Sequence, residues 1–182
     1  MASARKRPVK KGGRASHIPP RSFRFRRTTL DDMPCLIAHR HGMWAEIGGR
    51  TEAQITEHDR RYRTWVRTRM KSGEIIGVLA EAPGVGPVAS GCVWFRPDHP
   101  RPVIKASRSP YILSVFTDPA YRRQGLATRI VKDLLEISRK RGYVRATLHA
   151  SDMGKNVYAQ IGFEPWFEWR YWLDPSKRPK HR

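Results

Sequence analysis

The stretch that decides the fold reads Tyr111-Ile-Leu-Ser-Val-Phe-Thr117, then Asp118-Pro-Ala-Tyr-Arg-Arg-Gln-Gly-Leu-Ala127. Its first part predicts a buried strand, and its second part predicts a tight basic loop with a single glycine, Gly125. From Leu126 to Ser138 apolar residues recur with helical spacing, which predicts a helix. The first N–H groups of a helix have no partner inside it, and the helix dipole is positive there. This junction therefore predicts an anion site where backbone comes close to its ligand at Gly125.

The segments around this core alternate between helical and extended periods. Thr29 and Thr51 each precede an apolar set with helical spacing, and we expect them to cap helices over about 30–40 and 51–71, joined by an irregular loop at 43–49. The other expected elements are strands at 23–27, 74–81, 88–96, 144–150 and 163–173 and a short helix at 156–161. A meander followed by strand, helix and strand predicts an α/β fold with a mixed, mostly antiparallel twisted sheet and helices on both faces.

The net charge of +20 is concentrated at the two ends of the chain. Residues 1–27 hold ten Lys or Arg and no acidic residue, and residues 174–182 hold four against one Asp. Little in residues 1–21 can be buried, so we expect a disordered basic tail there, a folded domain over 22–173 and a second basic tail over 174–182. Such tails contact nucleic acid, anionic membranes or acidic protein surfaces, or remain solvated extensions.

Several classes of protein are disfavoured by what the sequence lacks. No run approaches the ~18 apolar residues of a membrane span, and no apolar segment follows the basic N-terminus as in a secretory signal. Cys35 and Cys92 are expected to be the reduced thiols of a cytoplasmic protein. No metal site is expected, because no His/Cys cluster has ligand spacing. The glycine patterns of dinucleotide-binding and P-loop enzymes are also absent.

Two motifs together resemble the core of the GCN5-related N-acetyltransferase (GNAT) superfamily. The pyrophosphate motif of that family, Arg/Gln-x-x-Gly-x-Gly/Ala, is matched by Arg122-Arg-Gln-Gly-Leu-Ala127. Its second signature is a Tyr at the start of a short helix that ends in Gly-Phe, and it is matched by Tyr158-Ala-Gln-Ile-Gly-Phe163. His149-Ala-Ser-Asp-Met-Gly154 resembles a bacterial branch of the superfamily, many of whose members have no assigned substrate. The resemblance implies a GNAT-like sheet with a splayed central strand.

The resemblance also implies acetyl-CoA as the acyl donor. Its pyrophosphate would bind the backbone of the basic loop, and the hydroxyl of Thr128 would add to that site. The loop residues are Arg122, Arg123, Gln124, Gly125, Leu126 and Ala127. Val115 and Thr117 would bond the pantetheine amides, and the N–H of Val115 would stabilise the thioester oxyanion, which is worth roughly 3–4 kcal/mol. Ser151 stands where the family often has an Asn that binds the cofactor.

Acetyl transfer to an amine requires two proton movements, because the acceptor ammonium must lose a proton and the departing thiolate must gain one. By resemblance Tyr158 protonates the sulfur; the alternative is that its ring only packs against the core. Glu46 and Glu81 are alternative candidates for the base, each acting through ordered water, and His149 ranks after them.

The acceptor is expected to be a primary amine of a small molecule, peptide or protein, acetylated by direct transfer in a ternary complex. The arginines of 60–69 and the basic loop 96–108 favour an acidic or phosphate-bearing acceptor. The alternative is a nucleic-acid- or ribosome-associated protein on a GNAT scaffold, with an aminoacyl or protein amine as acceptor. An exposed aromatic edge at 163–173 would allow a homodimer. Tryptophans that line the cleft, or pack in the core, are Trp44, Trp94, Trp166, Trp169 and Trp172.

Overall fold

The computed structural model describes residues 22–99, 107–169 and 171–173. The predicted tails at 1–21 and 174–182, and part of the loop after 97, lie outside these residues. The strands are β1 (Arg24–Arg27), β2 (Ile75–Ala82), β3 (Gly86–Pro97) and β4 (Arg108–Thr117). The helices are α1 (Met33–Ile47), α2 (Glu52–Lys71), α3 (Leu126–Lys140) and α4 (Lys155–Ile161).

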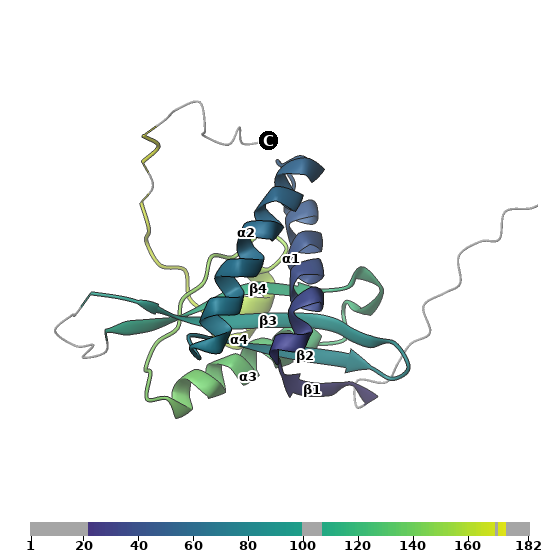
Figure 1. Cartoon of the computed structure of the whole chain (residues 1–182). Coiled ribbons are helices and arrows are strands. Elements are labelled where there is room, and N and C mark those ends of the chain that lie inside the picture. Colours follow the sequence, from purple (N-terminus) through teal and green to yellow (C-terminus); the bar gives the residue numbers. More distant parts are fainter. Residues whose placement is uncertain (1–21, 100–106, 170, 174–182) are drawn as a thin grey trace, which may run out of the picture.

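The four strands form one antiparallel sheet in the order β1–β2–β3–β4, with helices on both of its faces (Figure 1). Residues of β2 alternate between the two faces, as the pleat of a strand requires. Val78 and Ala80 pack in the core that α3 covers. Ile75 and Leu79 pack in the core that α1 and α2 cover. The predicted α/β fold with two helical layers is confirmed.

The first helical layer begins with two capped turns. Thr29 precedes a 3-10 turn at Leu30–Asp32, and its N–H donates to Oδ2 of Asp32 at 2.7 Å. Thr51 begins α2 with a capping box, in which its hydroxyl accepts from the N–H of Gln54 and its own N–H donates to the Gln54 side chain. The predicted N-cap Thr51 is therefore confirmed, because its hydroxyl satisfies an N–H that the helix leaves unpaired. Thr29 lies at the start of the 3-10 turn, whereas α1 itself begins after Asp32.

Helix α1 is longer than predicted and includes much of the segment expected to be an irregular loop at 43–49. Gly42 does not end the helix. An added Cβ on Gly42 would stand 3.0 Å from the ring of Phe116, so the ring packs directly against the helix backbone there and stabilises the next turn. The helix ends at Gly48, whose φ of 76° suits glycine.

The second layer is formed by α3, which lies directly on β3. Its buried residues Ile130 and Leu134 approach Gly91, where an added Cβ would stand 2.8 Å from Cγ2 of Ile130. This contact requires glycine, because a larger residue would push the helix away from the sheet. The position of α3 matters because its N-terminus follows the basic loop.

Two predicted strands are wrong. The segment 144–150 meets β4 at a single parallel bridge between Tyr111 and Thr147, and no strand is assigned within 163–169 or 171–173. Their residues have high strand propensity, but a strand also needs a neighbour against which one face is buried. Val144 and Trp169 are instead 85% and 93% exposed.

No helix in the described part of the chain is long and apolar enough to cross a membrane.

Candidate active site

The edge of β4 that faces away from β3 is open beyond Ile112. The N–H of Ile112 donates to the carbonyl of Thr147 at 2.8 Å, and the described residues form no further bridge to this edge. A bulge interrupts β4 just beyond, where Ser114 has a φ of 52° and neither it nor Val115 has a register partner in β3. The structure thus opens β4 at the residues that the sequence assigns to a splayed strand, because the bulge redirects the backbone there.

The basic loop joins this strand to α3. Asp118 accepts from the N–H of Ala120 at 2.9 Å and starts a 3-10 turn at Pro119–Tyr121. Arg123 and Gly125 then have φ values of 63° and 75°, and α3 begins directly after them. No side chain caps this described helix start, and its first turn holds no acidic residue. Its N–H groups are therefore available to an anion.

Two buried polar atoms near this loop have no partner among the described residues: Oγ1 of Thr117 and Oε1 of Gln124. A buried polar atom without a partner is costly, so such atoms are satisfied by water or ligand. Both residues belong to the predicted cofactor-binding set, and their unsatisfied atoms fit a polar ligand along the end of β4 and the start of α3. The side chain of Thr128, in the first turn of α3, is half-buried beside them.

Arg122 already has partners on the protein. Its Nε donates to the carbonyl of Thr117 at 3.0 Å, and its Nη2 lies 2.5 Å from a carboxylate oxygen of Glu46 in α1. The structure therefore brings two predicted site residues, Glu46 and Arg122, into one ion pair. The neighbouring Arg123 is exposed.

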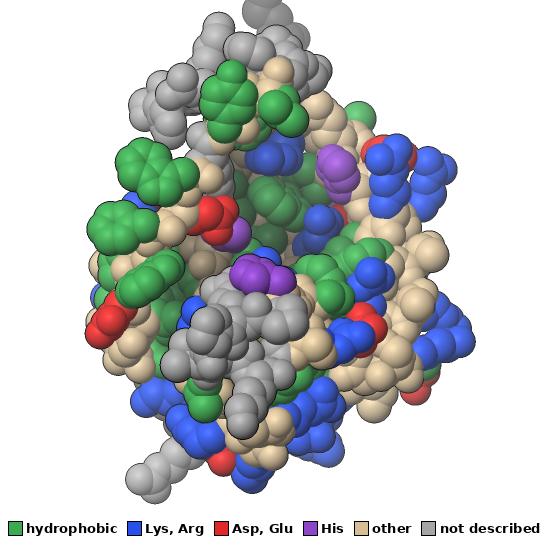
Figure 2. Space-filling model, turned by 90° about the vertical axis from the view of Figure 1, so that its left-hand side faces the viewer, with side chains coloured by type: hydrophobic (Ala, Val, Ile, Leu, Met, Phe, Trp, Pro, Cys, Tyr) green, Lys and Arg blue, Asp and Glu red, His purple; other side chains and the backbone are tan. Residues whose placement is uncertain are grey.

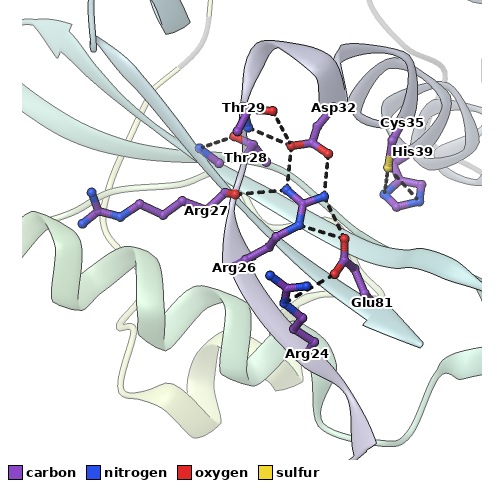
Figure 3. A network of polar contacts seen from close by, with 10 residues as sticks. Arg24, Arg26, Arg27, Thr28, Thr29, Asp32, Cys35, His39 and Glu81 are labelled. Carbon is purple, nitrogen blue, oxygen red and sulfur yellow. Dashed lines mark hydrogen bonds and ion pairs between the residues drawn. The ribbon is translucent and has the colours of Figure 1, made fainter. Parts of the chain in front are cut away.

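Glu81 lies elsewhere, in a network between β1, β2 and the start of α1 (Figure 3). Its carboxylate accepts from Nε of Arg26 at 2.8 Å, and the same guanidinium binds both oxygens of Asp32 at 2.7 Å. The hydrogen bonds from Arg26 lower the pKa of Asp32. Because β2 is separated from β4 by β3, the structure does not bring Glu81 to the open edge, and its contacts are those of a structural ion-pair network.

Tyr158 lies in α4 and packs against the core beneath α3. Its ring meets Phe163 edge-on at 5.8 Å, and an added Cβ on Gly154 would stand 2.8 Å from its Cε2. Ser151 lies beside the same turn, and its carbonyl accepts from the N–H of Gly154 at 2.9 Å. Burial raises the pKa of the Tyr158 phenol, and Tyr111 adds to the rise. The phenol is therefore kept protonated, as a proton donor must be.

Sequence reasoning missed two polar residues at the junction of β4 with the segment after α3. The hydroxyl of Tyr111 is hydrogen-bonded to Nδ1 of His149, and Nε2 of His149 lies 3.0 Å from Oε2 of Glu168. His149 was among the candidates for the base, but Tyr111 and Glu168 were not. No short motif joins these residues, since 38 and 19 positions separate the bonded pairs.

Aromatic and arginine side chains form a second group, on the face of the sheet that α1 and α2 cover. Trp65 meets Trp94 edge-on at 5.0 Å, and the guanidinium of Arg69 lies 4.3 Å from the Trp65 ring. Arg50 lies 4.6 Å above the ring of Trp44. The indole nitrogens of Trp44 and Trp94 are buried without a partner in the described structure. An indole N–H usually finds a hydrogen-bond partner when it is buried, so Trp44 and Trp94 each leave a donor for a polar ligand or water, although Trp94 also packs against the core under α1 and α2.

The C-terminal tryptophans are arranged differently. Trp166 and Trp169 are 87% and 93% exposed, so core packing is wrong for both. Figure 2 shows the side of the molecule that lies to the left in Figure 1, which has a hollow with hydrophobic side chains along one rim and basic and histidine side chains around it.

Comparisons with known proteins agree with this geometry. Residues 33–163 match the model of the acetyltransferase (GNAT) family. The chain is 30% identical over 95 residues to the glucosamine 6-phosphate N-acetyltransferase of Trypanosoma brucei brucei, a match that covers 52% of this chain and 63% of that relative's length.

Solved structures share the fold. A GCN5-related N-acetyltransferase from Ralstonia eutropha JMP134 has a TM-score of 0.76 at 26% identity, over 83% of this chain and 98% of the other. A predicted acetyltransferase with acetyl-CoA from Clostridium acetobutylicum also has a TM-score of 0.76, at 22% identity, over 86% of this chain and 98% of the other. The predicted membership of the GNAT superfamily is confirmed. With a family match over most of its length, a matching fold and the open strand beside a basic loop, this chain belongs to the acetyltransferase (GNAT) family.

Proposed function

We propose that this protein transfers the acetyl group of acetyl-CoA to a primary amine that carries a phosphate or another acidic group. The observation that carries the proposal is the half-buried phenol of Tyr158, kept protonated and lying near Tyr111 of β4, together with the open edge of β4 that leads into the uncapped N-terminus of α3. Acetyl-CoA supplies a thioester, a pantetheine chain and a pyrophosphate, and these three parts match three features of this chain.

Different residues of this chain bind the cofactor, stabilise the thioester oxygen and protonate the leaving sulfur. The N-terminus of α3 and its loop bind the pyrophosphate, and the unsatisfied atoms of Thr117 and Gln124 add polar contacts. The N–H of Val115, freed by the bulge, stabilises negative charge on the thioester oxygen. Tyr158 donates its proton to the departing sulfur, because a thiolate leaves more readily when it is protonated.

The choice of acceptor rests on charge and on a relative. Arg50 lies over the Trp44 ring between α1 and α2, and no carboxylate of the described residues pairs with it, so its charge can attract an anionic group. Arg40 and Arg69 also lie over aromatic rings, but they pair with Asp59 and Glu74. The curated relative from Trypanosoma brucei brucei is named for a phosphate-bearing amine, glucosamine 6-phosphate. Both observations support a phosphorylated amino sugar as the first acceptor to test.

The test is release of CoA from acetyl-CoA on addition of glucosamine 6-phosphate and a panel of other amines. Acetyl-CoA at about 100 times its Kd should stabilise the fold by about 2.7 kcal/mol, since it binds the folded state alone. Tyr158→Phe should lower kcat by about 100-fold while this stabilisation is kept. Tyr143→Phe is the matched control, because the Tyr143 ring stacks on Phe95 in the α3 core. Full activity of Tyr158→Phe at every pH would show that its phenol is not the acid.

A further inference from the structure

Tyr111, His149 and Glu168 form a continuous hydrogen-bonded chain. An ionised carboxylate only accepts hydrogen bonds, so Nε2 of His149, 3.0 Å from Glu168, carries the proton and donates it. In a neutral imidazole the other nitrogen is then an acceptor. The Tyr111 hydroxyl therefore donates to Nδ1 of His149. Glu168 thus selects the tautomer that leaves His149 ready to receive a proton from Tyr111.

These hydrogen bonds lie where the outer edge of β4 is still paired, just before the edge becomes open. Tyr111 is the residue of β4 that bridges to Thr147, and the edge opens after its neighbour Ile112. In the register with β3, Tyr111 lies opposite Trp94, on the face that α1 and α2 cover. Tyr111 is also near enough to Tyr158 to raise its pKa. The phenols of Tyr111 and Tyr158 therefore lie near one another, close to the start of the open edge of β4.

Charged groups around Tyr111 favour proton movement toward His149. The guanidinium of Arg96 lies 4.6 Å from the centre of the Tyr111 ring. The Glu168 carboxylate lies on the far side of His149, so a proton that moves from Tyr111 to His149 moves away from a cation and toward an anion. The Tyr111 and His149 rings lie 5.6 Å apart at an angle of 60°. Tyr158 is a further titratable group near Tyr111.

The two glutamates first considered for the base are engaged elsewhere. Glu46 pairs with Arg122 at the loop, and Glu81 pairs with Arg26 in the β1–β2 network. In each pair a guanidinium N–H occupies a carboxylate oxygen that a base would need for the acceptor's proton. Neither is therefore as well arranged to accept a proton as Tyr111, which has an acceptor nitrogen directly behind it.

We propose that Tyr111 removes the proton from the acceptor ammonium. His149 receives the proton that Tyr111 gives up, and Glu168 holds His149 in the tautomer that can receive it. This inference rests on the proposed function. In the step, an ammonium N–H bond breaks and its proton joins the Tyr111 oxygen, directly or through one water, while the Tyr111 proton moves to Nδ1 of His149. The imidazolium that forms is held by Glu168, and the neutral amine then attacks the thioester. The thiolate leaves with the proton of Tyr158, so the two phenols have opposite roles.

The kinetic test compares two acceptors. With glucosamine 6-phosphate, Tyr111→Phe and His149→Gln should each lower kcat by about 100-fold at neutral pH, because general acid–base catalysis typically contributes at least that much. Hydroxylamine is largely unprotonated at neutral pH and needs no base, so with it both variants should keep the wild-type rate above the uncatalysed blank. Equal losses with both acceptors would overturn the proposal, since they would indicate a structural effect.

His58→Gln is the matched control, because His58 lies exposed on α2, and it should leave both rates unchanged. Stabilisation by acetyl-CoA, measured for each variant, shows that the fold is intact.

A second readout requires no acceptor. Nitrogen NMR of the His149 ring should show the tautomer with the proton on Nε2, and Glu168→Gln should shift the population toward the other tautomer. A proton on Nδ1 in the wild-type protein would overturn the proposal by itself. If hydroxylamine and every tested amine fail to release CoA from the wild-type protein, the proposed function fails and the inference falls with it. If the wild type is active but Tyr111→Phe matches it with glucosamine 6-phosphate, only the inference fails.

Discussion

Glu46 and Arg122 are held in one ion pair, and this limits what each can do. The pair is partly exposed, with side-chain exposures of 29% and 37%, so its net contribution is about 1 kcal/mol or less. Glu46→Gln should release Arg122 to the cofactor and remove a negative charge beside it. We expect the Kd of CoA to fall by up to about fivefold, measured by calorimetry, with little change in kcat.

The same variant decides between two roles for Glu46. A loss of about 100-fold in kcat with unchanged CoA affinity would identify Glu46 as the base and contradict the ion-pair interpretation. Glu57→Gln is the matched control, because Glu57 also pairs with arginines, Arg60 and Arg61, but on the exposed side of α2.

Single residues were predictable where a local motif contains them. Tyr158 stands four positions before a glycine that ends its helix, and the structure packs its half-buried ring against the core. Tyr111 and Glu168 carry no such signal, because their contacts with His149 are set by how β4 meets the segment after α3. Glu81 was a candidate base at the end of the expected strand 74–81, but it binds Arg26, which lies 55 positions away, and no local pattern indicates that contact.

Between elements, His41 connects α1 to α2. Its Nδ1 lies 2.6 Å from Oδ2 of Asp59, and its Nε2 lies 3.1 Å from Oε1 of Glu52. The hydrogen bond to Asp59 is the main cause that raises the pKa of His41. A raised pKa in the folded state means that the stabilisation is fully present below the unfolded pKa of about 6.5 and is lost as pH rises through the folded value.

His41→Gln should therefore destabilise the protein at mildly acidic pH, by about 1 kcal/mol or less, and have less effect at mildly alkaline pH. Chemical denaturation across this pH range measures the difference. His58→Gln, on an exposed face of α2, should show no such dependence. An equal loss at all pH values would mean that His41 contributes by packing rather than by its charge.

The sequence predicted a helix or strand well where residues close in sequence stabilise it, and less well where contacts with distant segments decide it. The start of α2 follows from its Thr51 cap, and the extent of α3 follows from the helical spacing of its apolar residues, and the structure has both close to the predicted positions. The end of α1 depends on Phe116 from β4, which packs at Gly42, so the sequence placed it too early. The segments 144–150 and 163–173 have strand-like composition, but neighbours decide whether a strand forms.

For the whole molecule, the property to test is whether the basic N-terminal segment contributes to the folded domain. Residues 1–21 hold seven Lys or Arg, and the first strand begins after them at Arg24. Deleting 1–21 should leave the stabilisation by acetyl-CoA unchanged, because every candidate cofactor contact lies between Val115 and Tyr158. Affinity for a nonspecific RNA should fall and become less sensitive to salt, because fewer counterions are released.

Thermal unfolding with acetyl-CoA and titration of RNA at several salt concentrations measure the two effects separately. Loss of the stabilisation on deletion would show that the tail belongs to the folded domain, and the predicted boundary at residue 22 would be wrong.

The open edge of β4 has a consequence for how long the protein lasts. Beyond Ile112 the outer edge of β4 has no neighbouring strand among the described residues. A pantetheine chain, with its amides in an extended line, offers the groups that such a strand would offer. Under the proposed function the acetyl donor is therefore also a temporary fifth strand. When the donor is scarce, more molecules carry an exposed edge, and such molecules open and are degraded sooner. Supply of the donor would then set the abundance of the enzyme as well as its rate.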